Sequence, residues 1–230
     1  MRAFLIPVAL AAALAACSPR PAGEPKTAAA TPEAKTAPAA AKAPREASAG
    51  VYAMDLQHTS VVFRVPHMGL SRYTARFTKA EGQLTFDPAN PAAQSVTATI
   101  DASSLATAYP DAAKLDFDAQ VEKEFLDTAE YPQITFRSTK VEPTGAETAR
   151  VTGDLTLHGV IRPVVLEVTY NGGYKASAMD PKDRIGFSAH GTFKRSDFGI
   201  AYGVPAPGTT FGVGDEVEVI IESEFTKLPG

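Results

Sequence analysis

Two arms of the segment from Arg150 to Tyr170 have a repeat of two residues. The apolar positions recur at every second residue on two arms, and they are Val151, Gly153, Leu155, Leu157, Val164, Leu166, Val168 and Tyr170. A period of two is typical of strands with one buried face. His158-Gly159 lies between the arms, where a tight turn needs residues that accept a positive φ. The segment therefore predicts a β-hairpin with an apolar inner face.

The same alternation recurs before and after this hairpin. It predicts further strands at Val51–Gln57, Thr59–Pro66, Tyr73–Phe86, Ser95–Ile100, 133–141, Arg184–Lys194 and Glu216–Phe225. We expect a break at His58, between the first two of these strands. We also expect a bend or bulge at Gly82, because a glycine inside a strand often marks one.

The segment from Asp101 to Glu130 departs from this alternation. Leu115, Ala119 and Glu122 have the spacing of a helix face, so one or two short helices fit better than a strand. We expect these helices outside the barrel or across one of its open ends. The acidic residues of this region are expected to form a solvated helix face, and they are Asp111, Asp116, Asp118, Glu122 and Glu124.

About eight strands, mostly antiparallel to their neighbours, predict an all-β fold. We expect an antiparallel up-and-down barrel whose interior is either filled or holds a ligand. A β-sandwich is the alternative. An outer-membrane barrel is disfavoured, because its outer face would be apolar, whereas the outward positions here carry Glu, Thr, Arg and Asp.

The inward positions of the predicted strands are aliphatic or phenylalanine. They are Val61, Phe63, Val65, Phe77, Ile134, Phe136, Leu155, Leu157, Leu166, Val168, Phe187, Phe193, Val219 and Ile221. These side chains either line a ligand pocket or fill a solid barrel core. Side chains alone can fill an eight-stranded barrel, so the pattern leaves both interpretations open.

The first residues read as a secretion signal. A basic start, Met1-Arg2, precedes an apolar run from Phe4 to Ala16, which is too short to span a membrane as a mature helix. Leu14-Ala-Ala-Cys17 resembles a bacterial lipobox, which implies a signal peptide at residues 1–16 and acyl chains, palmitate among them, on Cys17. An ordinary cleaved signal is the alternative. Several acyl chains give a stable membrane anchor, at roughly 0.8 kcal/mol per buried methylene. The same resemblance implies the outer membrane, because the residue after the cysteine is Ser18 and not Asp.

Residues 17–50 are expected to form a disordered tether behind the lipidated cysteine. From Ser18 to Gly50 the chain has 12 alanines and 6 prolines and no large aliphatic or aromatic residue. Such a segment buries too little apolar surface to offset the entropy lost on ordering. The globular domain is therefore expected at residues 51–230.

Charge and cysteine content narrow the function classes. Residues 51–230 carry 16 basic and 23 acidic side chains, a formal charge of about −7, so a nucleic-acid partner is not expected. The single cysteine excludes a disulfide framework. The sequence also contains no serine-nucleophile elbow, phosphate-binding loop or dinucleotide fingerprint.

The histidines and one arginine are the candidates for chemistry. His58, His67, His158 and His190 lack the spacing of a metal site, so no metal and no catalytic residue is expected. His158 reads as a turn residue and His190 as an exposed one. His67 is a candidate contact for a ligand head group. Arg195 either forms an ion pair with Asp197 or contacts a phosphate head group through its guanidinium fork.

Taken together, these segments resemble the YceI-like family. The matching pieces occur in the family's order, and they are Asp55–Phe63, His67–Ser71, Phe125–Ser138, Gly153–Pro163, Gly186-Phe187, Arg195–Gly199 and Val213–Val217. Tyr52 stands where the family often has Trp, and Ala75 where Gly is more usual. The resemblance implies a lipocalin-like periplasmic barrel that binds an isoprenoid lipid, such as a polyprenyl phosphate or a quinone, with no cofactor and without catalysis.

Two alternative functions stay open. One is a metal-dependent hydrolase or redox enzyme that uses a histidine site. The other is a structural lipoprotein whose barrel is plugged and holds no ligand. Homodimerisation, and the identity of the isoprenoid, are also left open by the sequence.

Overall fold

The structure, a computed structural model, describes residue 43 and residues 45–229. The predicted signal peptide, Cys17 and the tether up to Lys42 lie outside the described residues, so those expectations stay predictions. Within the described part of the chain, no helix is long and apolar enough to cross a membrane.

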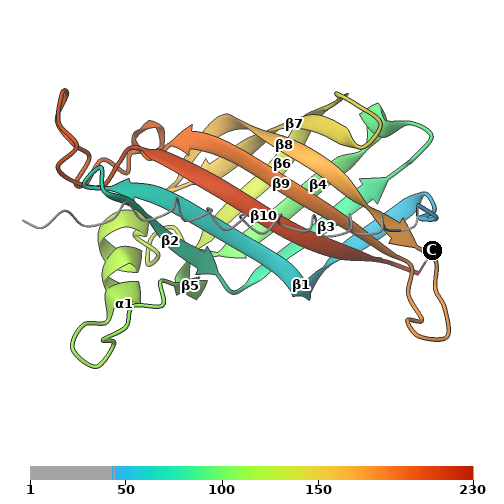
Figure 1. Ribbon diagram of the computed structural model, residues 1–230, viewed down its shortest axis with the longest axis horizontal. Coiled ribbons are helices and arrows are strands. Elements are labelled where there is room, and N and C mark those ends of the chain that lie inside the picture. Colours follow the sequence, from blue (N-terminus) through green and yellow to red (C-terminus); the bar gives the residue numbers. More distant parts are fainter. Residues whose placement is uncertain (1–42, 44, 230) are drawn as a thin grey trace, which may run out of the picture. The chain divides into compact units, whose positions relative to one another are not determined.

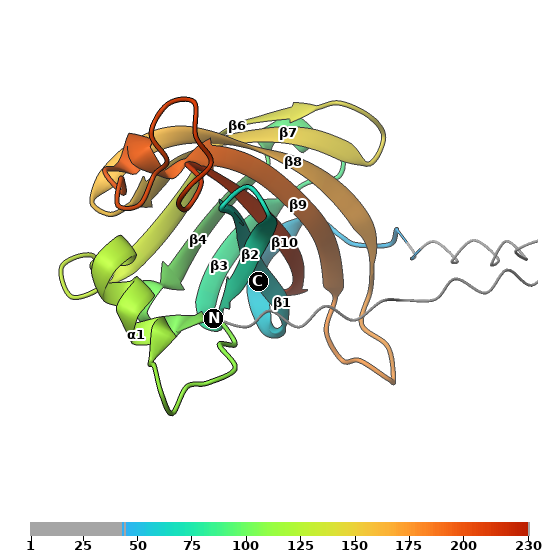
Figure 2. The same ribbon diagram turned by 60° about the vertical axis from the view of Figure 1, so that its left-hand side comes forward.

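Eight strands close into an antiparallel barrel (Figures 1 and 2). Around the ring they are β1 (Gly50–His67), β3 (Ala80–Phe86), β4 (Ser95–Asp101), β6 (Gln133–Pro143), β7 (Thr148–Leu157), β8 (Val160–Tyr174), β9 (Arg184–Lys194) and β10 (Glu216–Lys227). β10 pairs with β1 and closes the ring, with Tyr52 opposite Lys227 at one end and Arg64 opposite Glu218 at the other. The predicted barrel is confirmed, and the sandwich is excluded.

The hairpin predicted from residues 150–170 forms as β7 and β8. Thr148 lies opposite Thr169 and Leu157 opposite Val160. His158 and Gly159 make the turn between them with φ angles of 50° and 71°. Both residues thus adopt the left-handed conformation that a two-residue hairpin turn requires.

The predicted break at His58 is wrong, because β1 is one continuous strand. It passes the position through a shift in register against β10, between Asp55 and Ser60. Such a bulge lets a long strand bend without ending. β1 pairs with β10 on both sides of the bulge, so the two predicted strands form a single strand.

The single strand predicted from Tyr73 to Phe86 is divided into β2 (Ser71–Phe77) and β3. Thr78 and Lys79 separate them, and the Thr78 N–H donates to the Ser104 carbonyl instead of to a strand neighbour. β2 pairs with the second half of β1 and with the short β5 (Leu105–Ala106). The pairing of β3 with β4 is regular through Gly82, so the bulge expected at this glycine is not found.

The predicted helices form at one end of the barrel. α1 (Phe117–Val121) continues into a π-helical turn, η3 (Glu122–Leu126), and Asp116 caps α1 by accepting from the Ala119 N–H. Short 3-10 turns lie at η1 (Pro91–Ala93), η2 (Ala102–Ser104) and η4 (Arg195–Phe198). We call the end with α1 the helix end. The turn after β1, the β7–β8 turn and the long loop before β10 lie at this end.

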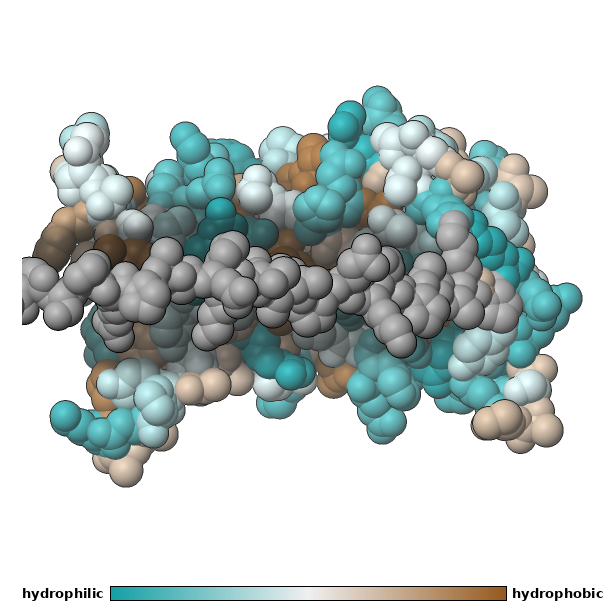
Figure 3. Space-filling view, in the orientation of Figure 1, coloured by the Kyte–Doolittle hydropathy of each residue, from teal (hydrophilic) through white to brown (hydrophobic). Residues whose placement is uncertain are grey.

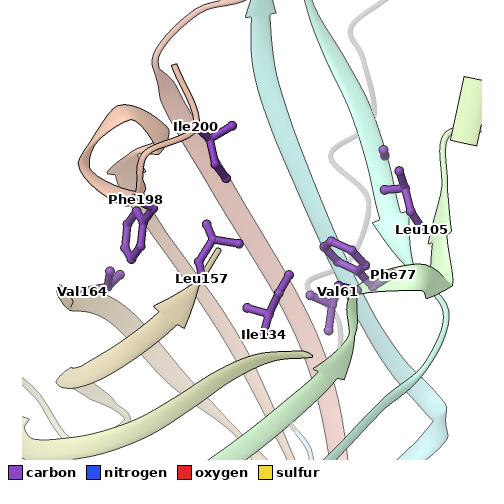
Figure 4. Close-up of a cluster of buried hydrophobic side chains, with 10 residues drawn as sticks. Val61, Phe77, Leu105, Ile134, Leu157, Val164, Phe198 and Ile200 are labelled. Atoms are coloured by element: carbon purple, nitrogen blue, oxygen red, sulfur yellow. The ribbon is translucent and has the colours of Figure 1, made fainter. Parts of the chain in front are cut away.

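Side chains from many strands meet inside the barrel. Figure 4 shows one cluster near the helix end, where Val61, Ile134 and Leu157 from different strands point toward each other and toward Ile200 of the β9–β10 loop. A second cluster, around Tyr52, Phe86 and Ile185, lies toward the opposite end. The barrel interior is therefore packed in two separate groups, one toward each end.

The chain contacts the barrel before β1 begins. The Glu46 N–H donates to the Gly173 carbonyl on β8, and Arg45 forms an ion pair with Glu147. Ala47 packs against the second cluster, and the Ser48 hydroxyl donates to Asp183. The barrel's contacts therefore start several residues before the predicted domain boundary at Val51.

Candidate functional site: the barrel cavity

A cavity of about 960 Å³ runs through the barrel. Its wall includes residues of both ends, from Phe117 and Tyr202 at the helix end to Ala47 and Pro143 at the opposite end. Alternation places every second strand residue on this inner wall, and those residues are aliphatic or aromatic. The volume is at the upper end of what small-molecule pockets hold. The site is therefore a long apolar cavity with room for one extended molecule.

All fourteen inward residues predicted from the strand pattern line this cavity. They are Val61, Phe63, Val65, Phe77, Ile134, Phe136, Leu155, Leu157, Leu166, Val168, Phe187, Phe193, Val219 and Ile221. Only some of them are fully buried from solvent, such as Val61 and Ile134. Of the two interpretations that the sequence left open, the structure favours a lined pocket over a solid core. That these side chains contact a ligand stays a prediction.

Sequence reasoning missed the parts of the wall that do not come from strands. Val121 and Phe125 from the helical segment, Tyr202 and Val213 from the β9–β10 loop, and Arg45 from the N-terminal segment also line the cavity. A period-two pattern cannot identify them, because they reach the cavity only after the chain has closed over the barrel ends.

Arg195 is buried at the helix end and is held by main-chain carbonyls. Its Nε donates to Gly214, one terminal nitrogen to Ile200 and Tyr202, and the other to Val213, at 2.7 to 2.9 Å. Its guanidinium also lies over the Phe125 ring, 5.6 Å from the centroid. Burial lowers the pKa of the guanidinium, and the carboxylate of Asp215 opposes that shift.

These hydrogen bonds contradict the predicted ion pair of Arg195 and restrict its predicted contact with a phosphate head group. Arg195 does not form the expected ion pair with Asp197; among the described residues its hydrogen bonds go to carbonyls. Four of its five N–H groups are occupied in this way. A bidentate contact with a phosphate would therefore require the loop around Arg195 to rearrange.

His67 lies at the end of β1, lines the cavity at the helix end and is exposed. Its backbone pairs with Val213 of the β9–β10 loop, which places it at the edge of the opening. A contact with a ligand head group is compatible with this position and stays a prediction.

The other histidines lie apart from one another and from the cavity. His58 Nδ1 is 2.9 Å from Asp55 Oδ2, and His190 is exposed on β9. His158 makes the β7–β8 turn, and its ring packs in a tilted arrangement against Tyr131, 4.6 Å between centroids. Within residues 45–229, no three His, Cys, Asp or Glu side chains come together as a metal site would require.

The acidic residues of the helical segment do not form one solvated face. Asp118 accepts hydrogen bonds from both the N–H and the hydroxyl of Thr107, so it fixes the loop before α1. Burial raises the pKa of Glu122, and the nearby Asp118 carboxylate adds to the shift. Glu124 lines the cavity edge, where it accepts from the Gln120 amide at 3.1 Å. Three of the five residues, Asp111, Asp116 and Glu124, are exposed as predicted, whereas Asp118 and Glu122 are partly buried.

Solved structures share this fold. The barrel is similar to BcnA from Burkholderia cenocepacia, with a TM-score of 0.63 and 28% identity over 74% of this chain and 98% of that one. It is similar to a Campylobacter jejuni YCEI protein at a TM-score of 0.59, with 28% identity over 71% of this chain and 90% of that one. A polyisoprenoid binding domain from Saccharophagus degradans, 15% identical over 77% of this chain and 98% of that one, shares the fold at a TM-score of 0.57.

Sequence comparisons agree with the structural ones. The chain is 40% identical to Protein YceI of Escherichia coli O157:H7 over 183 residues, which cover 77% of this chain and 87% of that protein. It is 39% identical to a UPF0312 protein of Pseudomonas savastanoi over 169 residues, or 72% of this chain and 82% of that one. The profile of the YceI-like domain matches residues 52–225. The chain therefore belongs to the YceI-like family.

Proposed function

We propose that this protein binds an isoprenoid lipid whose tail lies in the barrel cavity. The observation that carries the proposal is the cavity itself, about 960 Å³ in volume and lined by aliphatic and aromatic side chains from end to end. Burying a hydrocarbon tail there contributes roughly 25 cal/mol of binding free energy per Å² of apolar area. A long tail can therefore bind through burial alone, without a covalent bond or a polar contact. A plugged structural barrel would leave no such space.

The fold gives independent support for a lipid ligand. The Saccharophagus degradans domain that shares this barrel is named for polyisoprenoid binding. We extend that ligand class to this chain because the strand positions that form its wall carry apolar side chains suited to a hydrocarbon tail. The proposal assigns no catalytic step and no cofactor to the protein.

We further propose that the bound lipid has an uncharged head group, as a quinone has. The charged residues on the cavity wall are Arg45, Glu124, Glu147 and Arg195, together with the titratable His67. Arg45 is paired with Glu147, and the Arg195 fork is occupied by carbonyls. In a polyprenyl phosphate, the charged phosphate would be buried without a free arginine to pair with it. Burying an unpaired charge in this way costs several kcal/mol.

The proposal includes a location and a role. Lipidation at Cys17 would hold the barrel on the periplasmic side of a membrane, the outer membrane by preference. There it would sequester or carry the lipid, at the end of a tether that reaches roughly 30 Å as a flexible coil. Incorporation of labelled palmitate into the full chain, and its loss in Cys17→Ala, would test the anchor.

The ligand is tested by native mass spectrometry of the full chain, purified in mild detergent from a bacterial envelope. We expect an added mass that releases a quinone-type lipid on denaturation. Ala189→Phe, which fills the middle of the cavity from β9, should reduce the bound fraction at least tenfold. His190→Phe is the matched control, because its side chain is exposed on the outside of the same strand.

Three results would count against the proposal. A bare protein mass that persists after incubation with isoprenoid lipids would favour a ligand-free structural barrel. Equal binding by Ala189→Phe and the parent chain would place the lipid outside the cavity. Release of a polyprenyl phosphate would contradict the proposal of an uncharged head group but would agree with the proposal of an isoprenoid tail.

A further inference from the structure

Large apolar side chains project into solvent around the helix end of the barrel. Leu70, on the turn between β1 and β2, is 87% exposed, and Phe211, on the loop between β9 and β10, is 81% exposed. Tyr202 on the same loop is 61% exposed, and Tyr109 before α1 is also exposed. We call these four residues the apolar rim. In Figure 3, some apolar residues are visible at this left-hand end, near α1, among pale and hydrophilic ones.

The loops that carry Leu70 and Phe211 have no charged residue. From Gly199 to Gly214 there are 16 residues without Asp, Glu, Lys or Arg, and Met68 to Ser71 has none either. Since 21% of the chain is charged, a segment of that length would ordinarily carry about three charged residues. Each charged side chain would add several kcal/mol to the cost of moving a loop from water into a lipid phase, and these loops avoid that cost.

The two loops are fixed to each other and to the cavity edge. The Met68 N–H donates to the Gly212 carbonyl, and His67 pairs with Val213. Tyr202 packs on Phe125 at 5.2 Å between ring centroids, and both residues line the cavity. The rim is therefore continuous with the cavity wall, so that a tail leaving the cavity at this end would meet the rim first.

Among residues 45–229, the opposite end has no comparable surface. Met179 alone is prominently exposed there, on the β8–β9 loop, and that loop carries Lys175, Asp180, Lys182 and Asp183. Outside the helix end, the other exposed large apolar residues of the described chain are Val51, Leu56, Val165 and Leu228, each below 45% exposed. Ile161, at 59%, lies on β8 close to the helix end. The exposed apolar surface is thus concentrated at the helix end.

We propose that the apolar rim docks on a membrane surface, and that the lipid passes between the bilayer and the cavity through the helix end. The inference rests on the proposed function, because a bilayer is the source of the ligand only if that ligand is a lipid. Uncharged lipid surfaces are favoured over anionic ones, since Asp111, Asp116, Glu124, Asp127 and Glu130 surround α1 on the same end, with only Lys114 and Lys123 among them. The helix then lies beside the inserted loops without entering the bilayer.

The absence of tryptophan allows a direct test. In the full chain, Phe211→Trp places a single fluorophore on the rim, and Met179→Trp places one at the opposite end as a matched control. Each variant is added to phosphatidylcholine vesicles whose acyl chains carry bromine. We expect the emission of the tryptophan at position 211 to shift to shorter wavelength and to be quenched several-fold more than that at position 179.

The vesicle experiment distinguishes membrane docking from self-association of the protein and from a failure to bind lipid. Equal quenching at both positions, or none at position 211, would overturn the proposal, as would quenching that appears only with anionic vesicles. A blue shift that grows with protein concentration without vesicles would overturn it too, because a second copy of the chain would then cover the rim. Native mass spectrometry of the same Phe211→Trp protein reports the bound lipid, so a failure to dock is distinguished from a failure to bind.

A second pair of variants tests exchange. Leu70→Asp with Phe211→Asp should slow uptake of lipid from vesicles at least tenfold, while Met179→Asp leaves the rate unchanged. Neither Leu70 nor Phe211 lines the cavity, so the equilibrium affinity for the same lipid in detergent should not change. Unchanged uptake in the double variant would overturn the role of the rim.

Discussion

Arg184 links several elements at the opposite end of the barrel. It stands at the start of β9, with a side chain only 15% exposed, and it contacts the carboxylates of Asp55, Asp180 and Glu224. The hydrogen bond from Arg184 is the largest cause that lowers the pKa of Asp55 to about 2. One cation thus holds three carboxylates from two strands and a loop, which is more than an isolated surface pair provides.

Arg184→Met should lower the free energy of unfolding by about 1–3 kcal/mol at pH 7, between the values for exposed and buried pairs. Because the pKa of Asp55 is lower in the folded than in the unfolded state, its contribution is complete above about pH 5 and is lost as the pH falls toward 2. The difference between parent and variant should therefore shrink below about pH 4. Urea denaturation at pH 7 and at pH 3 measures both effects.

Arg150→Met is the control for this prediction. Arg150 pairs with Glu167 at 3.0 Å, but the side chains of both residues are about half exposed, so we expect a loss below about 1 kcal/mol. An equal loss in the two variants at pH 7 would contradict the prediction. So would a difference for Arg184→Met that stays constant down to pH 2.

Among the elements, the β9–β10 loop is held by the side chain of Arg195. The loop contributes Ile200, Tyr202 and Val213 to the cavity wall, and it carries Phe211 on the rim. It has five glycines from Gly199 to Gly214 and no strand pairing of its own beyond the contact of Val213 with His67. The four carbonyl bonds of Arg195 replace the pairing that a strand would supply.

Arg195→Met should destabilise the barrel by about 2–4 kcal/mol, because hydrogen bonds to a charged group contribute about 1.5–3 kcal/mol and buried carbonyls are left unsatisfied. Hydrogen exchange of the amides between residues 200 and 214 should accelerate far more than that of the strands. Arg195→Lys should recover little, because an ammonium cannot reproduce the planar fork. Lys194→Met, on the exposed neighbour, serves as the control, and acceleration spread evenly over the barrel would argue against a local role.

For the molecule as a whole, we expect the volume of the cavity to limit the length of lipid tail that the barrel can bury. It has a fixed volume and is lined along its full length, so each added isoprene unit finds apolar wall until the space is filled. The gain per buried methylene is roughly 0.8 kcal/mol. Affinity should then depend on tail length more than on head-group chemistry.

Dissociation constants across a series of quinones with increasing numbers of isoprene units test this expectation. The affinity should rise at least tenfold per unit for the first units and then reach a plateau once the cavity is filled. Ala189→Phe should move the plateau to shorter tails. An affinity that is independent of tail length would show that the tail lies outside the barrel.

The amino-acid sequence was enough to predict most of the strands, their inward faces and the fold class. A period of two shows which side of an extended segment is apolar, whatever that segment pairs with. Phe63, Leu166 and Ile221 could therefore be assigned to the inner face of the barrel before any pairing was known, and the structure places them on the cavity wall. The hairpin turn at His158-Gly159 and the short helix near Ala119 were also predicted correctly, because turn and helix signals are local in the chain. The resemblance to the YceI-like family came from the same segments.

Where the strands end and how the barrel closes depend on contacts between distant parts of the chain. β1 stays whole past His58 because β10, more than 150 residues further along the chain, pairs with it on both sides of the bulge. The chain divides after Phe77 because Thr78 finds its partner in Ser104. Arg195 donates to carbonyls of a loop that folds back over it. Arg45 forms an ion pair with Glu147 at the barrel end. Local alternation cannot encode such partners, since the free energy of each contact depends on which distant groups the closed barrel brings within reach.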